Sequence, residues 1–240
     1  MSDIKQLISI IIPVFNESES IGFLLDEVIN VMSLHKFNFE LIVVNDGSKD
    51  NTQQVLKQLT LKIKELSVIS LRKNYGQTAA MSAGFDNSKG DIVITLDGDL
   101  QNDPNDIPIL ISEINNGYDL ICGWRFDRKD KLINRKIPSK IANKLIARVT
   151  GLKLHDYGCS LKAFKKEIID DIKLYGELHR FLPVLANIEG ARIKEIKVNH
   201  RSRQYGSSKY GIDRTFRVLM DLLTVWFMTK FLTRPMYGFG

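Results

Sequence analysis

Three aspartates lie close together in "TLDGDLQNDP" (residues 95–104): Asp97, Asp99 and Asp103. Carboxylates this near to one another repel unless a cation or a shared proton offsets their charge. A single glycine separates Asp97 from Asp99, so in extended backbone both side chains would project to one face, and Gly98 would allow a ligand to approach closely. Two hard oxygen donors suit Mg²⁺ or Mn²⁺, which fill their remaining positions with waters and substrate phosphates. The short D-x-D pattern is weak by itself, but its place after "IVIT" and its continuation into "LQNDP" favour a divalent-cation site.

Several other chemistries are disfavoured by missing motifs. The turn "NDGSKDNT" lacks the lysine that follows glycine in a P-loop, and G-x-G-x-x-G does not occur. Neither a Ser-His-Asp order nor H-E-x-x-H is present, and the four histidines show no ligand spacing. Cys122 and Cys159 fit neither a disulfide framework nor a metal pattern, so we expect buried thiols in a reducing compartment. Hydride transfer and P-loop phosphate cleavage are therefore poor candidates.

The elements that must position the aspartates alternate regularly over the first 124 residues. Apolar, β-branched runs predict strands at 7–15, from 39 to just before Asp46, and at 66–71, 91–97 and 119–123. Amphipathic stretches predict helices at 16–32, from about Asp50, at 76–86 and at 104–116. This alternation predicts one α/β domain whose mostly parallel sheet carries helices on both faces. Such sheets bind ligands at the carboxyl ends of their strands, and the polar turns at 16–18, 45–48 and 97–103 all fall there.

The alternation fails beyond residue 124. The sequence predicts a basic helix at 133–150, a turn-rich segment "GLKLHDYGCSLKAF" (151–164), and short helices near 166–173 and 178–189. A further strand is expected at 192–198.

Positive charge is concentrated in two places although the whole chain carries only +6. Residues 125–148 hold nine Lys or Arg against two Asp, and residues 201–240 hold seven against two. This asymmetry suggests an anionic partner, either a membrane surface or a phosphorylated substrate, while two merely solvated basic helices stay an alternative. Nucleic acid is disfavoured because the basic residues alternate with aliphatic side chains and not with stacking aromatics.

Residues 213–232 read as a helix with a narrow polar stripe and a wide apolar face. Such a helix either packs on the domain or lies in a membrane interface. Trp226, Phe227, Phe231, Lys230 and Arg234 are residue types enriched at that interface, which favours the membrane. No stretch of the sequence is long and apolar enough to span a bilayer. We expect the terminal "RPMYGFG" to lead toward a hydrophobic segment beyond residue 240.

Four motifs together resemble the inverting family 2 glycosyltransferases with the GT-A fold: "IIPVFNE" (11–17), "VVNDGSKDNT" (43–52), "RKNYGQTAAMSAGF" (72–85) and "LDGDLQNDP" (96–104). Four more resemble the branch that transfers a sugar to a polyprenyl phosphate, which includes dolichyl-phosphate mannose synthase and bacterial undecaprenyl-phosphate glycosyltransferases: "GWR" (123–125), "NRKIPSKIAN" (134–143), "ELHRFLP" (177–183) and "RQYGSSKYG" (203–211). The likeness covers about residues 7–240. It implies a Rossmann-like GT-A domain at 1–212 and an amphipathic juxtamembrane helix at 213–240.

The resemblance also implies roles for particular residues. A nucleoside diphosphate sugar, with UDP favoured and GDP-mannose allowed, would contact Pro13, Phe15, Glu17, Asp46 and Asp97. The metal, Mg²⁺ or Mn²⁺, would be held by Asp97, Asp99 and Gln101. The lipid phosphate would be held by Arg125, Arg135, Ser139, Arg203 and Lys209. Asp156 matches an acidic position near the sugar, so the catalytic set would be Asp156, Asp99, Arg125 and Arg203.

The physical chemistry of such a transfer agrees with these roles. A phosphate monoester has a second pKa near 6 and is already largely ionised at neutral pH, so it hardly needs a general base. It needs positioning and charge neutralisation, which planar guanidinium groups provide. Asp156 would then orient sugar hydroxyls or tune the site, although a role as base stays open. In-line attack would invert the anomeric centre of the donor.

Two rival functions stay open. One is a family 2 enzyme that acts on a carbohydrate hydroxyl, although the Q-x-x-R-W signature of processive members is not found. The other is a non-catalytic nucleotide-sugar binder. The favoured function places the enzyme on the cytoplasmic face of a membrane, most simply the bacterial inner membrane, and allows a homo-oligomer.

Overall fold

The computed structural model describes residues 6–127, 146–148, 150–172, 174, 176, 178–205, 220, 223, 224, 226 and 227. Of the expected elements, the basic helix at 133–150 and the helix at 213–232 fall mostly outside these residues.

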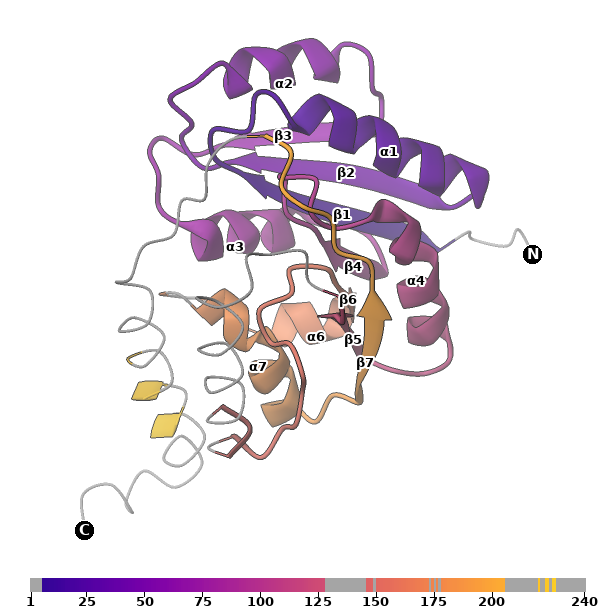
Figure 1. Cartoon of the computed structure of the whole chain (residues 1–240), viewed down its shortest axis with the longest axis vertical. Coiled ribbons are helices and arrows are strands. Elements are labelled where there is room, and N and C mark those ends of the chain that lie inside the picture. The colour runs from indigo at the N-terminus through magenta and orange to yellow at the C-terminus, as the bar shows by residue number, and fades with distance from the viewer. Residues whose placement is uncertain are drawn as a thin grey trace.

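One seven-stranded sheet forms the centre of the described chain (Figure 1). Its strands are β1 (Leu7–Val14), β2 (Asn38–Asn45), β3 (Leu66–Ser70), β4 (Ile92–Thr95), β5 (Leu120–Arg125), β6 (Lys162–Lys165) and β7 (Ile193–Val198), in the order β3-β2-β1-β4-β6-β5-β7. β1 pairs in parallel with β2 and β4, β2 with β3, and β5 with β7. The expected mostly parallel sheet is confirmed, and every strand except β6 lies where the sequence predicted one.

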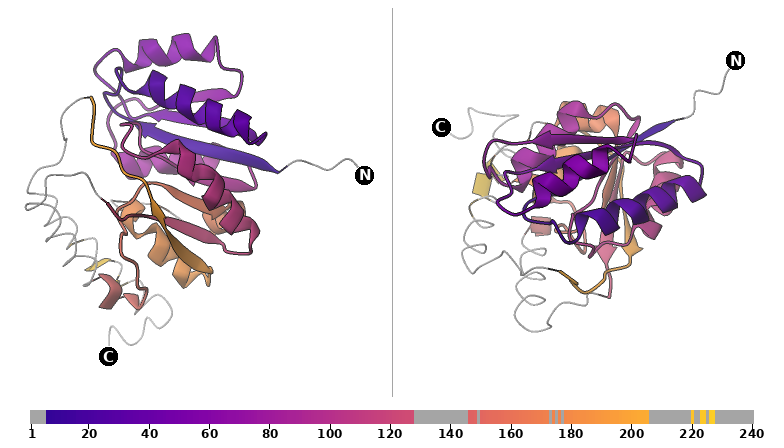
Figure 2. Two further views of the ribbon diagram at one scale, coloured as in Figure 1. Left: turned by 45° about the vertical axis from the view of Figure 1, so that its right-hand side comes forward. Right: turned by 90° about the horizontal axis from the view of Figure 1, so that it is seen from above.

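Helices cover both faces of the sheet, as Figure 2 shows from two further sides. α1 (Ile21–Leu34), α2 (Thr52–Thr60) and α4 (Ile107–Asn115), which follows the 3₁₀ turn Pro104–Asp106, pack on the face that includes Ile8, Ile10 and Ile12. α3 (Gln77–Asn87), α6 (Lys166–Asp171) and α7 (Leu182–Ile188), which follows the 3₁₀ turn Leu178–Phe181, pack on the face that includes Ile11, Ile42 and Val44. A strand that is buried on both faces is apolar along nearly its whole length, which is why "LISIIIPV" shows no regular alternation of polar and apolar residues.

The segment expected to be only turns contains a strand. β6 runs antiparallel to both β4 and β5, so the sheet is mixed and the order of strands in space departs from their order in sequence. Its four residues, "KAFK", form no apolar run, so the sequence gives no signal for a strand here. They are buried in the folded chain because strands lie on both sides of β6. This strand matters for function because it follows directly on the turn that contains Asp156.

Two local expectations were wrong. α1 begins at Ile21 and not at residue 16, because Asn16 adopts a left-handed conformation (φ 53°) that belongs to a turn. β4 ends at Thr95, so Asp97 and Asp99 lie in a turn beyond the strand and not on an extended backbone. The expected burial of the cysteines is confirmed, since Cys122 and Cys159 are free and buried, and the reducing compartment stays a prediction. Burial raises the pKa of the Cys122 thiol to about 12. Among the described residues, no helix is long and apolar enough to cross a membrane.

Candidate active site

The polar turns after β1, β2 and β4 meet at one edge of the sheet, as their sequence positions predicted. The backbone N–H of Asn16 donates to Ser48 Oγ (2.9 Å), and the backbone N–H of Glu17 donates to Thr52 Oγ1 (2.9 Å). Ser20 Oγ donates both to the carbonyl of Gly98 and to the carboxylate of Glu17, each at 2.9 Å. These bonds fasten the three turns into one surface.

Asp46 connects this surface to the turn before α3. Its two carboxylate oxygens accept the backbone N–H groups of Tyr75 (2.7 Å) and Gly76 (2.9 Å). Gly47 is needed beside it, because its φ is 64° and an added Cβ would lie only 2.4 Å from the carbonyl carbon of Lys73. Asp46 therefore fixes the wall of the expected nucleoside pocket. Pro13 lies half-buried in β1 and Phe15 just after it, at the same edge.

Asp97 and Asp99 lie in a tight turn in which Leu100 has a left-handed φ of 61°. Asp97 accepts a hydrogen bond from Gln77 Nε2 (2.8 Å), and Asp99 accepts the backbone N–H of Gln101 (3.1 Å). Burial, and next the charge of Asp97, raise the pKa of Asp99 to about 6, although the charge of Arg203 acts in the opposite direction. A buried carboxylate with a second one beside it is a group that a bound cation would stabilise.

An arginine already lies against this carboxylate. Arg203 Nη2 is 2.5 Å from Asp99 Oδ2, and Nη1 is 3.9 Å from Glu17 Oε1. Nη1 is buried, and among the described residues it makes no hydrogen bond. The guanidinium thus supplies positive charge at the point where a cation was expected, and it has a donor to spare for an anion.

The carboxylate pair fits a divalent cation by its chemistry. Asp97 and Asp99 would hold the ion, and a diphosphate would supply further oxygens, as is usual for Mg²⁺ sites with few protein ligands. Within the described part of the chain no group of three or more His, Cys, Asp and Glu side chains could hold a metal alone. Gln101 contacts Asp99 through its backbone N–H, while its side-chain Nε2 donates to the carbonyl of Arg201 at 3.4 Å.

Residues 199–205 run on from the end of β7, as Figure 1 shows for the orange segment above that strand. They bring Arg203 to Asp99 and Tyr205 to Phe23 of α1. Several contacts hold this segment. Asn199 bonds to Asp106, His200 bridges to Asn102, Arg201 pairs with Glu27 and Asp103 at 2.7 and 2.8 Å, and the Tyr205 ring stacks on Phe23. Asp103, the third aspartate of the cluster, therefore belongs to the support of this segment and not to the carboxylate pair.

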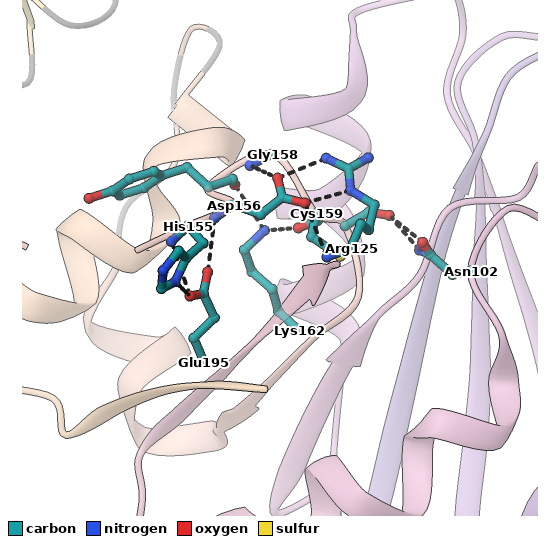
Figure 3. A network of polar contacts seen from close by, with 10 residues as sticks. Asn102, Arg125, His155, Asp156, Gly158, Cys159, Lys162 and Glu195 are labelled. Carbon is teal, nitrogen blue, oxygen red and sulfur yellow. Dashed lines mark hydrogen bonds and ion pairs between the residues drawn. The ribbon is translucent and has the colours of Figure 1, made fainter. Parts of the chain in front are cut away.

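Asp156 forms a two-pronged ion pair with Arg125 at the end of β5 (Figure 3). Arg125 Nε donates to Oδ2 (2.7 Å) and Nη2 to Oδ1 (2.9 Å), and Gly158 N–H also donates to Oδ1 (3.2 Å). Burial works to lower the pKa of Arg125, but the hydrogen bonds and charge of Asp156, with smaller contributions from Cys159 and Asp97, raise it above its ordinary value. Because β4 and β5 both run antiparallel to β6, the end of β5 that carries Arg125 lies at the same edge of the sheet as the turn after β4.

The structure thus brings together most of the residues expected at the site. Arg135, Ser139 and Lys209 lie outside the described residues, so their roles stay predictions. Three further contacts were not foreseen: Gln77 to Asp97, Arg203 to Asp99, and Glu195 behind Asp156. Gln77 lies in the motif "RKNYGQTAAMSAGF", which could have indicated it, whereas Glu195 lies in a charged strand with no such signal.

The fold and the site together define a glycosyltransferase of the GT-A type. The family model for glycosyl transferase family 2 matches residues 9–173, and this chain belongs to that family. It is 48% identical to dodecaprenyl-phosphate galacturonate synthase of Rhizobium johnstonii, over 97% of this chain and 70% of the relative. It is 41% identical to undecaprenyl-phosphate 4-deoxy-4-formamido-L-arabinose transferase of Proteus mirabilis, over 90% of this chain and 67% of the relative.

A solved structure supports the fold independently. Glucosyl-3-phosphoglycerate synthase from Mycobacterium tuberculosis, solved with Mn²⁺, UDP-glucose and phosphoglyceric acid, superimposes with a TM-score of 0.71. The match covers 93% of this chain and 79% of that one at 18% identity, and it therefore concerns the fold alone.

Proposed function

We propose that this enzyme transfers a sugar from a nucleoside diphosphate sugar to a polyprenyl phosphate, with inversion at the anomeric carbon. The single observation that carries the proposal is the placement of Arg125, which Asp156 holds at the edge of the sheet that also carries the turn with Asp97 and Asp99. That arrangement offers a cation to a second anion next to the site where a diphosphate would lie. The names of the two relatives, which both include a polyprenyl phosphate, support the same acceptor.

The donor half of the site is the edge formed by the turns after β1, β2 and β4. Pro13, Phe15, Glu17 and Asp46 would surround the nucleoside, with UDP favoured as its diphosphate. Asp97, Asp99 and Gln101 would hold Mg²⁺ or Mn²⁺, which when bound stabilises charge on the departing diphosphate. Arg203 would lie close to the same charge, because it is already 2.5 Å from Asp99.

The acceptor half is centred on Arg125. Nε and Nη2 are bonded to Asp156, and we assign the remaining Nη1 group to the lipid phosphate. An ionised phosphate oxygen is itself the nucleophile, so no proton has to be removed. Asp156 accepts from Arg125 and Gly158 and is a poor candidate for a base. We assign it to the positioning of Arg125.

A carbohydrate hydroxyl as the acceptor is the second candidate. A hydroxyl needs a general base within hydrogen-bond reach. The carboxylates here are instead engaged with Arg125, Arg203 and Gln77, which favours the phosphate.

The function is tested directly by a product assay. Purified enzyme with Mn²⁺ and undecaprenyl phosphate in mixed micelles is supplied in turn with several UDP-sugars and GDP-mannose. We expect one donor to give a lipid-linked product that is stable to alkaline phosphatase, with the nucleoside diphosphate released in equal amount. Release of nucleoside diphosphate only when a carbohydrate replaces the lipid would instead establish the rival function.

Membrane contact through residues 213–234 is part of the proposal, with the enzyme on the cytoplasmic face of the bacterial inner membrane. Among the described residues of this segment, Met220, Leu223, Trp226 and Phe227 are all exposed, so they do not form part of the core. Exposed aromatic and aliphatic side chains beside Lys and Arg are typical of interfacial helices.

We expect the protein to float with liposomes that contain anionic lipid, less so at high salt, and a chain ending at residue 212 to lose this binding. Liposomes of neutral lipid serve as the control for the electrostatic part. Equal flotation by the shortened chain would place the membrane contact elsewhere.

A further inference from the structure

We propose that Glu195 is a positioning residue for the acceptor phosphate, and that it acts by fixing the turn that carries Asp156. The inference rests on the proposed function in one respect: it takes Arg125 as the group that receives the phosphate. Glu195 lies on β7, 39 residues from Asp156 in sequence and outside every motif that indicated the site.

Glu195 binds the Asp156 turn through its backbone. Its Oε1 accepts the N–H of Asp156 (2.9 Å), and its Oε2 accepts the N–H of His155 (3.0 Å). The imidazole Nδ1 of His155 lies 2.7 Å from the same Oε2. The Glu195 side chain is only 10% exposed, so these bonds form where water competes poorly. A carboxylate that accepts two consecutive amides restricts both the position and the orientation of the peptide between them.

Two further residues, Lys162 and Trp124, also hold the Asp156 turn in place. Lys162, which is 3% exposed, directs its ammonium group to the carbonyls of Tyr157 and Cys159. The His155 ring stacks on Trp124, with centroids 4.1 Å apart and planes 14° apart. Trp124 immediately precedes Arg125 in β5, so the stacking connects the two sides of the ion pair a second time.

These contacts form a closed circuit around Arg125. β5 pairs with β7, with Cys122 opposite Glu195 and Trp124 opposite Lys197. Glu195 then holds the amide of Asp156, and the Asp156 carboxylate returns to the Arg125 guanidinium, as Figure 3 shows with Asp156 between the two. The direction in which Nη1 points is thus set by two contacts: Arg125 is fixed in β5, and its guanidinium is held by Asp156, which Glu195 positions in turn. A shift of about 1 Å in a positioning group is enough to lower a transfer rate substantially.

The test replaces Glu195 with glutamine, which keeps the shape but loses the charge and one acceptor. We expect kcat/KM for undecaprenyl phosphate to fall by about tenfold or more, while KM for the donor and the slow hydrolysis of donor without acceptor change by less than about twofold. In the Arg125→Ala background the same change should add less than about twofold, because its effect passes through Arg125. Glu113→Gln is the matched control. Glu113 lies on α4 and pairs at 2.7 Å with Lys194, the neighbour of Glu195 on β7, but it makes no contact with the Asp156 turn in the described part of the chain.

A spectroscopic measurement keeps the inference separate from the proposed function. The Nε–H resonance of Arg125, identified by its loss in Arg125→Ala, reports the bond to Asp156 without any lipid. We expect it to shift and to exchange faster with water in Glu195→Gln, and to be unchanged in Glu113→Gln. If wild-type enzyme makes no lipid-linked product, the proposed function fails while this signal still decides whether Glu195 positions Arg125. An unchanged signal, or equal losses with donor and acceptor, would overturn the inference.

Discussion

Replacing Asp99 with asparagine is expected to lower turnover by about 1,000-fold or more, because one of the two carboxylates that we propose to hold the cation is lost. The variant should fold, since asparagine matches the shape of the aspartate and removes a charge whose burial is unfavourable, as its raised pKa shows. Release of nucleoside diphosphate measures turnover, Mn²⁺ binding by electron paramagnetic resonance measures the metal, and circular dichroism measures folding.

Asp103→Asn is the matched control for this experiment. Asp103 lies in the same turn and undergoes the same chemical change, but it pairs with Arg201 and accepts the N–H of Asn105. We expect its activity to stay within about threefold of wild type, because Arg201 keeps a second carboxylate partner, Glu27, at 2.7 Å. Activity of Asp99→Asn within about tenfold of wild type, or an equal loss in both variants, would contradict the metal site.

The wild-type protein should bind Mn²⁺ with an affinity that depends on pH. The metal competes with a proton on Asp99, whose pKa in the folded protein is about 6 against an ordinary 3.8. Affinity should therefore be constant well above pH 6 and weaken by about tenfold per unit below it. The same group makes the metal-free fold less stable as pH rises from 4 toward 6, because the folded state then gives up a proton that the unfolded state has already released. Asp99→Asn should remove both dependences.

The second large effect is expected at Arg125. Arg125→Ala should lower kcat/KM for undecaprenyl phosphate by about 100-fold to 1,000-fold, the loss of roughly 3–4 kcal/mol of interaction with an ionised phosphate. Hydrolysis of the donor in the absence of lipid should change by less than about threefold. The substitution leaves Asp156 buried without its partner, so we expect stability to fall by about 3–5 kcal/mol. Kinetics are therefore measured at low temperature, where the variant is folded.

The double variant Arg125→Ala, Asp156→Asn separates stability from function. It removes both charges, so stability should recover in part while lipid-phosphate use stays low. Arg192→Ala is the control for loss of an arginine, since Arg192 forms an exposed pair with Asp119 away from the site. If donor hydrolysis and transfer to lipid fell equally in Arg125→Ala, Arg125 would belong to the donor half of the site.

Most of the fold could be predicted because, in the first half of the chain, each strand and helix has a recognisable pattern of apolar and polar residues. The apolar runs of β1, β2 and β4 are long, β-branched and bounded by polar turns, which few other structures would accommodate. β6 could not be predicted in this way. Its alternation of Lys162, Ala163, Phe164 and Lys165 resembles a surface segment, and only the pairing with β4 and β5 buries it.

The site residues also differ in how far they could be predicted: neighbours in the sequence could be recognised, whereas contacts between distant residues could not. Asp97 and Asp99 are neighbours in sequence, so the amino-acid sequence alone indicates their chemistry. The contact between Asp99 and Arg203 spans 104 residues, and that between Arg125 and Asp156 spans 31. No local rule relates such positions. The family resemblance indicated all four of these side chains as members of the catalytic set, yet which of them bind one another is decided only by the packing of the folded chain.

The antiparallel strand β6 has a consequence for how such enzymes diversify. Because β6 lies next to β5, the chain leaves the sheet after Arg125 and rejoins it at Lys162 in the adjacent position. Closing a longer excursion between two fixed neighbours costs little additional entropy, about 0.6 kcal/mol for each doubling of its length. The part of this excursion that precedes the Asp156 turn, which contains the predicted lipid-phosphate residues Arg135 and Ser139, can therefore vary in length while β1, β2 and β4 keep their register.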